Sequence, residues 1–229
     1  MYGGVSIPFS YILAVEVANI TQGCTGIAIN SYKAMTAQNC IVNYATDSFY
    51  SPETIKLCSN DTTCRPVTKT YLHPNSRKTP LIMCILQTES KLPSFIGFLG
   101  GFLETRCDIH TYGKSESGKR ERKSLILDPV SLCYTEDKSY ECVKLAKNSN
   151  LCSTDIGGGI ICDGSLVGIL VKTTPEKECD AAINEQMKGL FSKLTASRSW
   201  IEITAQVYVN RVLICQYCQF NIFDGRLFW

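Results

Sequence analysis

Apolar residues occur in this chain mainly as short runs that turn-forming residues separate. Such runs, each interpreted as a β-strand, occupy residues 11–17, 26–29, 81–86, 106–110, 160–162 and 166–171. Many short strands separated by turns are typical of β-sandwiches and β-barrels. A helical pattern appears only near the end, where Ser197 or Ser199 can cap a helix through Trp200, Ile201 and Ile203. The pattern predicts an all-β protein with one carboxyl-terminal helix.

The extension at residues 205–229 is rich in apolar side chains. They are Val207, Val209, Leu213, Ile214, Tyr217, Phe220, Phe223, Phe228 and Trp229. So much apolar surface is either covered or used as an interaction patch. Two alternatives stay open. The extension packs along the rest of the chain, with Cys215 and Cys218 tied together or nearby, or it forms a surface for self-association or a partner.

Composition excludes several function classes. The chain has 229 residues, 45% of them apolar, and a formal net charge of +2. A nearly neutral chain has no global electrostatic attraction to nucleic acid or to a membrane surface. No stretch approaches the roughly 18 apolar residues of a membrane span. We therefore expect no nucleic-acid partner and no membrane partner.

Thirteen cysteines indicate an oxidising compartment. The one Cys-x-x-Cys pair, Cys215 and Cys218, has no matching pair or histidine cluster, so metal binding is not favoured. The triplets at residues 19–21 and 60–62 are N-glycosylation sequons, which agree with secretion. The sequence predicts a secreted, extracellular protein with disulfides and no metal site.

Three further cysteines have local interpretations. Cys58 and Cys64 flank the second sequon and can close a short surface hairpin of their own. Cys84 lies in the apolar run 81–86 and is interpreted as a free buried thiol that packs as a small apolar side chain. The odd number of cysteines requires at least one such unpaired thiol.

Residues 152–164, CSTDIGGGIICDG, carry the most informative motif. This string resembles the active-site loop of the chymotrypsin-like (trypsin family) serine proteases, in which an aspartate precedes the reactive serine and two glycines follow it. Here Asp155 precedes Ile156, and Ile156 has no hydroxyl with which to attack. The resemblance implies that the nucleophile is missing.

The other two triad positions also differ from the family. Its histidine lies in a Thr-Ala-Ala-His-Cys-like string, which resembles residues 35–40, MTAQNC, so Asn39 occupies the position of the base. Its aspartate precedes an apolar strand that resembles residues 81–86, so Pro80 or a neighbour occupies the position of the acid. An amide cannot take a proton near neutral pH. The resemblance implies a triad degenerate at all three positions and hence no enzyme.

No other group of residues replaces the triad. The two histidines, His73 and His110, fall outside the triad positions, so we expect structural roles for them. The chain has no glycine-rich phosphate loop between a strand and a helix, and no Walker-type string. We expect no cofactor.

The resemblance extends from Gly3 to about Thr204 and implies a complete fold. That fold consists of two antiparallel six-stranded Greek-key β-barrels, about 1–98 and 99–204, that meet near the glycine-rich stretch 97–101 and end in a helix. The resemblance also implies four disulfides, Cys24–Cys40, Cys107–Cys162, Cys133–Cys142 and Cys152–Cys179.

The family's substrate pocket is altered as well. The residue two positions before the motif's first cysteine sets the charge of that pocket, and here it is the neutral Asn150. The family's Ser-Trp-Gly strand, which pairs with substrate, corresponds to Val171, Lys172 and Thr173. Thr154 replaces a glycine of the oxyanion pocket, where a Cβ restricts the backbone. The resemblance implies a blocked cleft.

The strongest charge cluster is a basic run beside the former cleft. Its cations are Lys114, Lys119, Arg120, Arg122 and Lys123. The resemblance places this run in a long surface loop. Two alternatives stay open, a solvated loop or an exosite for an acidic partner.

The amino terminus departs from the family in one respect. The family buries a new Ile-Val terminus against the aspartate that corresponds to Asp155, and this chain carries Met1-Tyr2 instead. Because Asp155 is retained, the resemblance implies that an activated-like conformation can persist without activity.

The overall pattern is most similar to that of the scabies mite inactivated protease paralogues. Membership would imply a secreted binding protein at the host-parasite interface that inhibits host complement and serves immune evasion, with complement components as partners. One alternative is a non-cutting decoy that binds protease substrates or inhibitors. Another is a residual serine-type endopeptidase. The scaffold alone does not choose among them.

Overall fold

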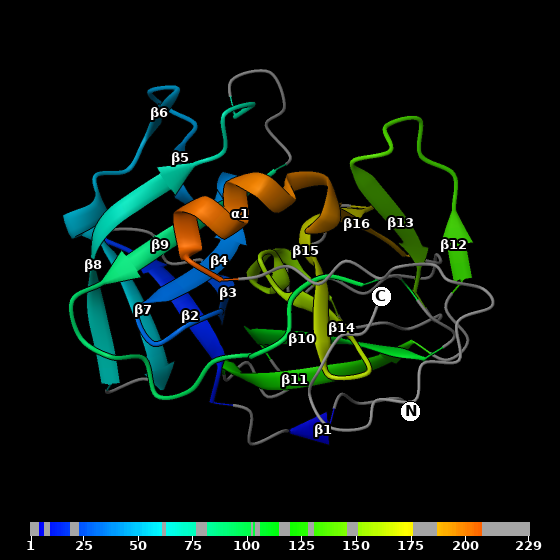
Figure 1. Cartoon of the computed structure of the whole chain (residues 1–229), viewed down its shortest axis with the longest axis horizontal. Helices are drawn as coiled ribbons and strands as arrows, with labels where there is room; N and C mark the ends of the chain where they lie inside the picture. Colours follow the sequence, from blue (N-terminus) through cyan, green and yellow to red (C-terminus); the bar gives the residue numbers. More distant parts are fainter. Residues whose placement is uncertain are drawn as a thin grey trace, which may run out of the picture.

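The computed structural model describes residues 5–6, 10–18, 23–60, 63–76, 82–101, 103, 106–114, 120–127, 131–145, 151–175 and 187–207. These residues form two β-structures that lie side by side, with an α-helix near their junction (Figure 1). The predicted all-β class with one carboxyl-terminal helix is confirmed.

The first half forms a closed barrel whose strands follow the order β2-β3-β4-β9-β8-β7. The strands are β2 (Ile12–Val17), β3 (Cys24–Ala28), β4 (Lys33–Ala37), β7 (Ile55–Asn60), β8 (Thr63–Leu72) and β9 (Met83–Thr88). The four consecutive residues 12–15 are all buried, because β2 packs against β10 of the second half as well as forming part of the barrel wall. A small hairpin, β5 (Val42–Asn43) and β6 (Ser48–Phe49), projects from this barrel.

The second half forms an eight-stranded antiparallel sheet in the order β1-β11-β10-β14-β15-β16-β13-β12. Its strands are β1 (Val5–Ser6), β10 (Cys107–Lys114), β11 (Arg120–Leu127), β12 (Ser131–Cys133), β13 (Tyr140–Lys144), β14 (Gly159–Cys162), β15 (Ser165–Thr174) and β16 (Lys188–Lys193). The six longer strands make the barrel-like body that the resemblance implies. The short strand β1 pairs with β11, so Val5 and Ser6 lie with the second half, whereas a division at 98/99 would assign them to the first.

Each of the six predicted strands overlaps an observed one, namely β2, β3, β9, β10, β14 and β15. The helix α1 (Arg198–Ala205) also lies where the pattern predicts it, with Ser197 at the N-cap position. The Ser197 side chain makes no capping hydrogen bond, however. Short 3-10 helices occupy Gln38–Ile41, Pro52–Thr54, Ser153–Asp155 and Thr195–Ser197.

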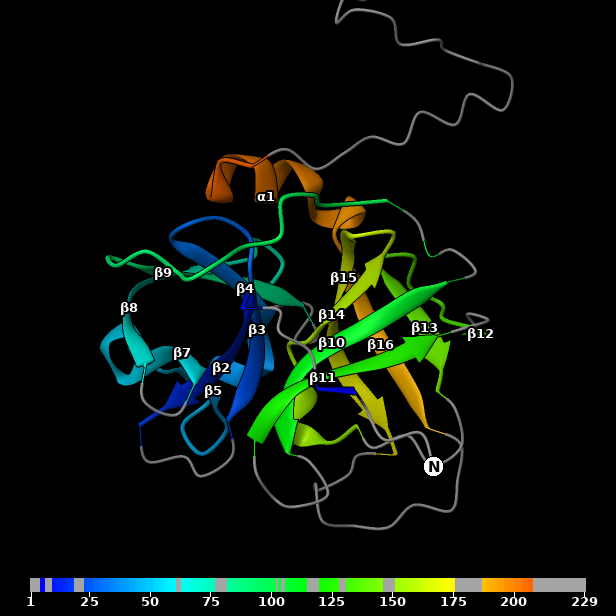
Figure 2. The same ribbon diagram turned by 90° about the horizontal axis from the view of Figure 1, so that it is seen from below.

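Helix α1 follows β16 of the second half but ends against the first barrel (Figure 2). There, Asn30 Nδ2 donates to Ala205 O at 2.8 Å and Lys33 Nζ donates to Thr204 O at 2.7 Å. These donors satisfy carbonyl groups that a helix end leaves without intrahelical partners. The helix therefore fastens one half of the molecule to the other.

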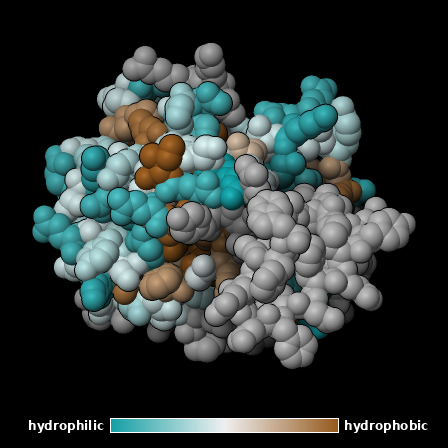
Figure 3. Space-filling model, in the orientation of Figure 1, coloured by the Kyte–Doolittle hydropathy of each residue, from teal (hydrophilic) through white to brown (hydrophobic). Residues whose placement is uncertain are grey.

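The surface around α1 is mainly hydrophilic, with small hydrophobic patches (Figure 3). Ile203 on α1 contributes to the exposed apolar area. None of the helices in the described part of the chain is long and apolar enough to cross a membrane. Residues 208–229, to which both alternatives for the extension refer, lie outside the described residues.

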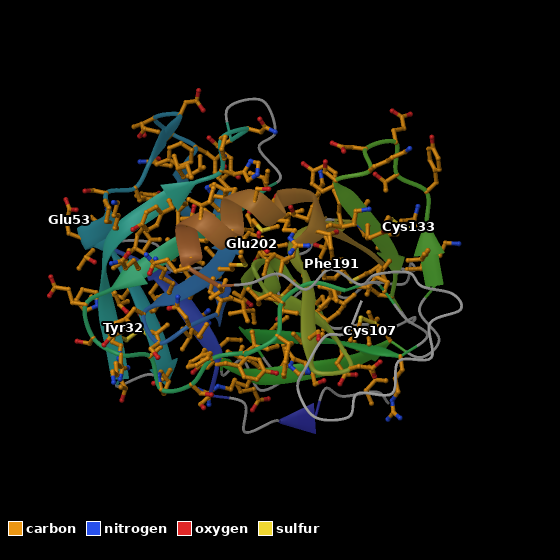
Figure 4. All side chains as sticks on the ribbon, in the orientation of Figure 1. Tyr32, Glu53, Cys107, Cys133, Phe191 and Glu202 are labelled. Atoms are coloured by element: carbon orange, nitrogen blue, oxygen red, sulfur yellow. A yellow bond between two sulfur atoms is a disulfide. The ribbon has the colours of Figure 1, made fainter. Side chains whose placement is uncertain are left out.

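Four disulfides join described residues, Cys24–Cys40, Cys58–Cys64, Cys107–Cys162 and Cys133–Cys142. All four are pairs that the sequence led us to expect. Cys107 and Cys133 both lie in the second half, as does Phe191, which points in among its strands (Figure 4). Cys152 is also disulfide-bonded, but its expected partner, Cys179, lies outside the described residues.

Candidate functional site

The loop at residues 151–158 lies at the junction of the two halves. It contains the 3-10 helix Ser153–Asp155 and leads into β14. Thr25 of the first barrel donates its backbone N–H to Ile156 O at 2.8 Å, and its hydroxyl donates to Thr154 O at 3.0 Å. The loop belongs to the second half by sequence, yet hydrogen bonds fix it to the first.

Gly157 allows this close approach. Its φ of +87° lies in the left-handed region, and a Cβ at this position would lie 2.0 Å from Thr25 O. Only glycine satisfies both conditions. The fold therefore requires glycine at position 157, whatever chemistry takes place at the neighbouring Ile156.

Asn39 reaches the same junction from the first barrel. It lies in the 3-10 helix that follows β4, and its Nδ2 donates to Val171 O on β15 at 3.1 Å. The neighbouring residue on that strand, Leu170, accepts a hydrogen bond from the Gly157 backbone. Ile156 precedes Gly157, and its carbonyl oxygen lies 3.7 Å from Sγ of Cys40, the residue after Asn39. The structure thus brings Asn39 and Ile156 to the same part of the junction. Pro80, which the resemblance places at or next to the position of the acid, lies outside the described residues.

The residues that the resemblance assigns to the substrate pocket have unequal exposure. Val171 and Thr173 are buried, whereas Lys172 between them is partly exposed. Thr154, which the resemblance places in the oxyanion pocket, is buried, and its carbonyl accepts a hydrogen bond from Thr25. Asn150 lies outside the described residues. The strand at residues 171–173 therefore presents little side-chain surface apart from Lys172.

Neither Asn39 nor Ile156 supplies an acid or a base at this junction. The amide of Asn39 does not accept a proton near neutral pH, and Ile156 is an alkyl side chain. Two buried hydroxyls at the junction donate hydrogen bonds to backbone carbonyls. Thr36 Oγ1 donates to Thr25 O at 2.6 Å, and Thr25 Oγ1 donates to Thr154 O.

Both histidines lie elsewhere, in structural surroundings as predicted. His73 packs edge-on against Trp200 of α1, with ring centroids 4.9 Å apart. His110 on β10 forms a hydrogen bond between its Nδ1 and the Tyr11 hydroxyl at 2.7 Å, and its Nε2 lies 3.7 Å from Asp108. Burial lowers the pKa of His110 and of His73, and burial raises the pKa of Tyr11 to about 12.

The basic run is not a surface loop over its second part. Arg120, Arg122 and Lys123 lie on strand β11. The Arg122 guanidinium donates to Ile12 O at 3.0 Å and to Ser59 O, so it is partly buried between the halves.

Arg120 makes similar contacts across the junction. Its guanidinium donates to Cys24 O at 2.9 Å and lies over the Tyr112 ring. Lys123 is buried against Asp155. Arg120, Arg122 and Lys123 therefore join parts of the molecule, and the exosite stays a prediction. The Lys114 side chain and Lys119 lie outside the described residues.

Among the described residues, one group of side chains has metal-ligand proximity, namely Glu16, Cys58 and Cys64. Cys58 and Cys64 are joined in a disulfide, and a disulfide sulfur is not the thiolate that binds a metal ion. This group therefore does not provide a metal site.

A closed β-barrel beside a barrel-like sheet is the architecture that the resemblance to the trypsin class implies. Residues 4–201 match the trypsin family, and the chain therefore belongs to that family. Among solved structures, the fold is similar to that of the scabies mite inactivated protease paralogue S-I1. The TM-score is 0.68 with 18% identity, over 89% of this chain and 99% of that one. At this identity the likeness shows a shared fold. No curated protein matches the chain.

Sequence reasoning missed several residues of the junction. Thr25 had no recognisable motif, and Lys123 was grouped with the basic run, which was interpreted as a solvated loop or an exosite. The one signal that could have identified Lys123 was the retained Asp155. A carboxylate that is buried needs a counter-charge.

Proposed function

We propose that this chain is a catalytically inactive serine protease homologue, substituted at all three triad positions, that works as a secreted binding protein. The supporting observation is the pair Asn39 and Ile156 at the same part of the junction. A serine-type mechanism requires a nucleophile and a base that form one unit. An amide and a branched alkyl group supply neither function, and Pro80 at the third position has no acidic side chain.

The proposed activity is inhibition of host complement at the host-parasite interface. It rests on the likeness to the mite inactivated protease paralogues together with the loss of chemistry, because a scaffold without chemistry can act only through its surface. The disulfides are of the kind that persist in extracellular proteins. The decoy hypothesis needs an open groove, and the burial of Val171 and Thr173 argues against it.

Two hairpins offer contact points for a protein partner. Tyr44, in the β5–β6 turn, is 75% exposed, and Tyr134, between β12 and β13, is 86% exposed. Both hairpins project on the same side of the molecule (Figure 1). Tyrosine is enriched among residues that dominate binding energy at interfaces. We include both residues in the proposed binding surface.

Purified protein added to serum at micromolar concentration tests the activity, with lysis of antibody-coated erythrocytes as the measurement. We expect reduced lysis by the folded chain and none of that reduction after its disulfides are reduced and alkylated. The variants Tyr44→Ser and Tyr134→Ser should weaken inhibition, whereas Ile203→Ser, at an exposed apolar residue of α1, serves as the matched control. Unchanged lysis with the folded chain would refute complement inhibition.

A further inference from the structure

The most deeply buried ion pair among the described residues lies at the base of the 151–158 loop. Lys123 Nζ donates to Asp155 Oδ2 at 3.0 Å. Asp155 is 0% exposed and Lys123 is 9% exposed. The other ion pairs in the described part of the chain involve side chains that are considerably more exposed.

The surroundings of Asp155 leave little room for another arrangement. Its Oδ2 also accepts a hydrogen bond from the Cys152 backbone N–H at 2.8 Å. Gly113 on β10 lies so close that a Cβ there would be 1.9 Å from Asp155 Oδ1. Lys123 is held in place by its strand, where it pairs with Thr111 across the β10–β11 hairpin. The hairpin thus supplies both the counter-charge and the steric enclosure.

We propose that Lys123 is the positioning residue for the 151–158 loop, and that the charge of this chain's own amino terminus is not needed for the loop's conformation. A buried carboxylate is stable only when it is paired and hydrogen-bonded. Lys123 supplies the counter-charge and a hydrogen bond to Oδ2 from within the folded chain, whereas Oδ1 is buried without a hydrogen-bond partner among the described residues. This inference does not depend on the proposed binding role.

The Lys123–Asp155 pair also affects the contact of the loop with the first barrel. The carbonyl groups of Thr154 and Ile156, on either side of Asp155, accept hydrogen bonds from Thr25. When Asp155 loses its counter-charge, the loop and these bonds should loosen together. Removal of one partner from a buried pair leaves an uncompensated charge, which is strongly unfavourable.

Hydrogen exchange of the peptide that spans residues 151–158 is the direct test. Three proteins are compared with the unmodified chain: Lys123→Met, a chain extended by several residues before Met1, and the control Lys193→Met. Lys193 forms a more exposed ion pair with Glu141 at 3.1 Å, so the control makes the same change of side chain at another ion pair.

We expect Lys123→Met to raise exchange in this peptide by at least about tenfold, and the extension and Lys193→Met to leave it unchanged. The conservative Lys123→Arg should restore most of the protection. The proposal is overturned when the extension raises exchange as much as Lys123→Met does, or when Lys123→Met has no effect. If Lys123→Met does not fold, the test rests on the chain extended before Met1. Unchanged exchange of the 151–158 peptide in that chain agrees with the proposal, and raised exchange contradicts it.

Discussion

Replacement of Thr25 by valine tests how the two halves are joined. Thr25 is 0% exposed, and its hydroxyl accepts a hydrogen bond from the Tyr112 backbone N–H at 2.9 Å while donating to Thr154 O at 3.0 Å. Valine has nearly the same shape but lacks the hydroxyl. Thr25→Val therefore leaves a buried N–H and a buried carbonyl without this partner.

The expected loss of stability follows from these two groups. Each buried polar group left without a partner costs about 1–3 kcal/mol, so we expect the free energy of unfolding to fall by about 2–6 kcal/mol. For a chain of this size, about 1 kcal/mol corresponds to roughly 2–4 °C in Tm. The Tm of Thr25→Val should therefore fall by at least about 4 °C.

Thermal unfolding and urea unfolding measure this loss, with Thr68→Val as the control. Thr68 is exposed and its hydroxyl donates to Gln87 O at 3.3 Å, so its replacement should change stability by no more than about 0.5 kcal/mol. Thr25→Ser keeps the hydroxyl and should lose less than Thr25→Val. Equal effects of Thr25→Val and Thr68→Val would show that the hydroxyl does not join the halves.

Three further predictions follow from single residues. Gly157→Ala should destabilise the fold far more than Gly164→Ala, because both have positive φ but only Gly157 faces a backbone atom, Thr25 O; equal urea midpoints would contradict this. Burial raises the pKa of the Cys84 thiol. Peptide mapping after treatment with an alkylating reagent should therefore find Cys84 modified only when denaturant is present, and rapid modification of the folded protein would refute its burial. Burial lowers the pKa of His110, so its contribution to stability is present above its unfolded pKa of about 6.5 and is lost as the pH falls through the lower folded value. His110→Asn should reduce the change in the free energy of unfolding between about pH 7 and 5. An unchanged pH dependence would show that His110 does not cause it.

Local sequence patterns were sufficient to predict those elements that depend on the order of apolar and turn-forming residues. The strands β2, β9 and β15 follow from apolar runs bounded by turns, since a strand that is buried on both faces tolerates few polar residues. The helix α1 also follows from a local signal, which left Ser197 and Ser199 both open as its N-cap residue. The disulfides required more than alternation, since only the family resemblance implied the pairing of Cys107 with Cys162.

The remaining features depend on contacts between distant residues. Strand β1 has two residues and therefore no periodicity that could assign it to a sheet. Arg122 and Lys123 look like solvated charges because their partners, Ile12 and Asp155, are far away in the sequence. A charge run shows where cations are, but only the fold determines whether they face water or a buried acceptor.

Labelling with a fluorophosphonate probe, which reacts with activated serines, tests the central claim of lost catalysis most directly. An active trypsin serves as the positive control, and cleavage of a peptide library is measured on the same samples. We expect no labelling and no cleavage from the folded chain, and none from Ile156→Ser, because Asn39 cannot activate the new hydroxyl. The account would be contradicted if the probe labelled the folded, unmodified chain and if heat denaturation abolished that labelling.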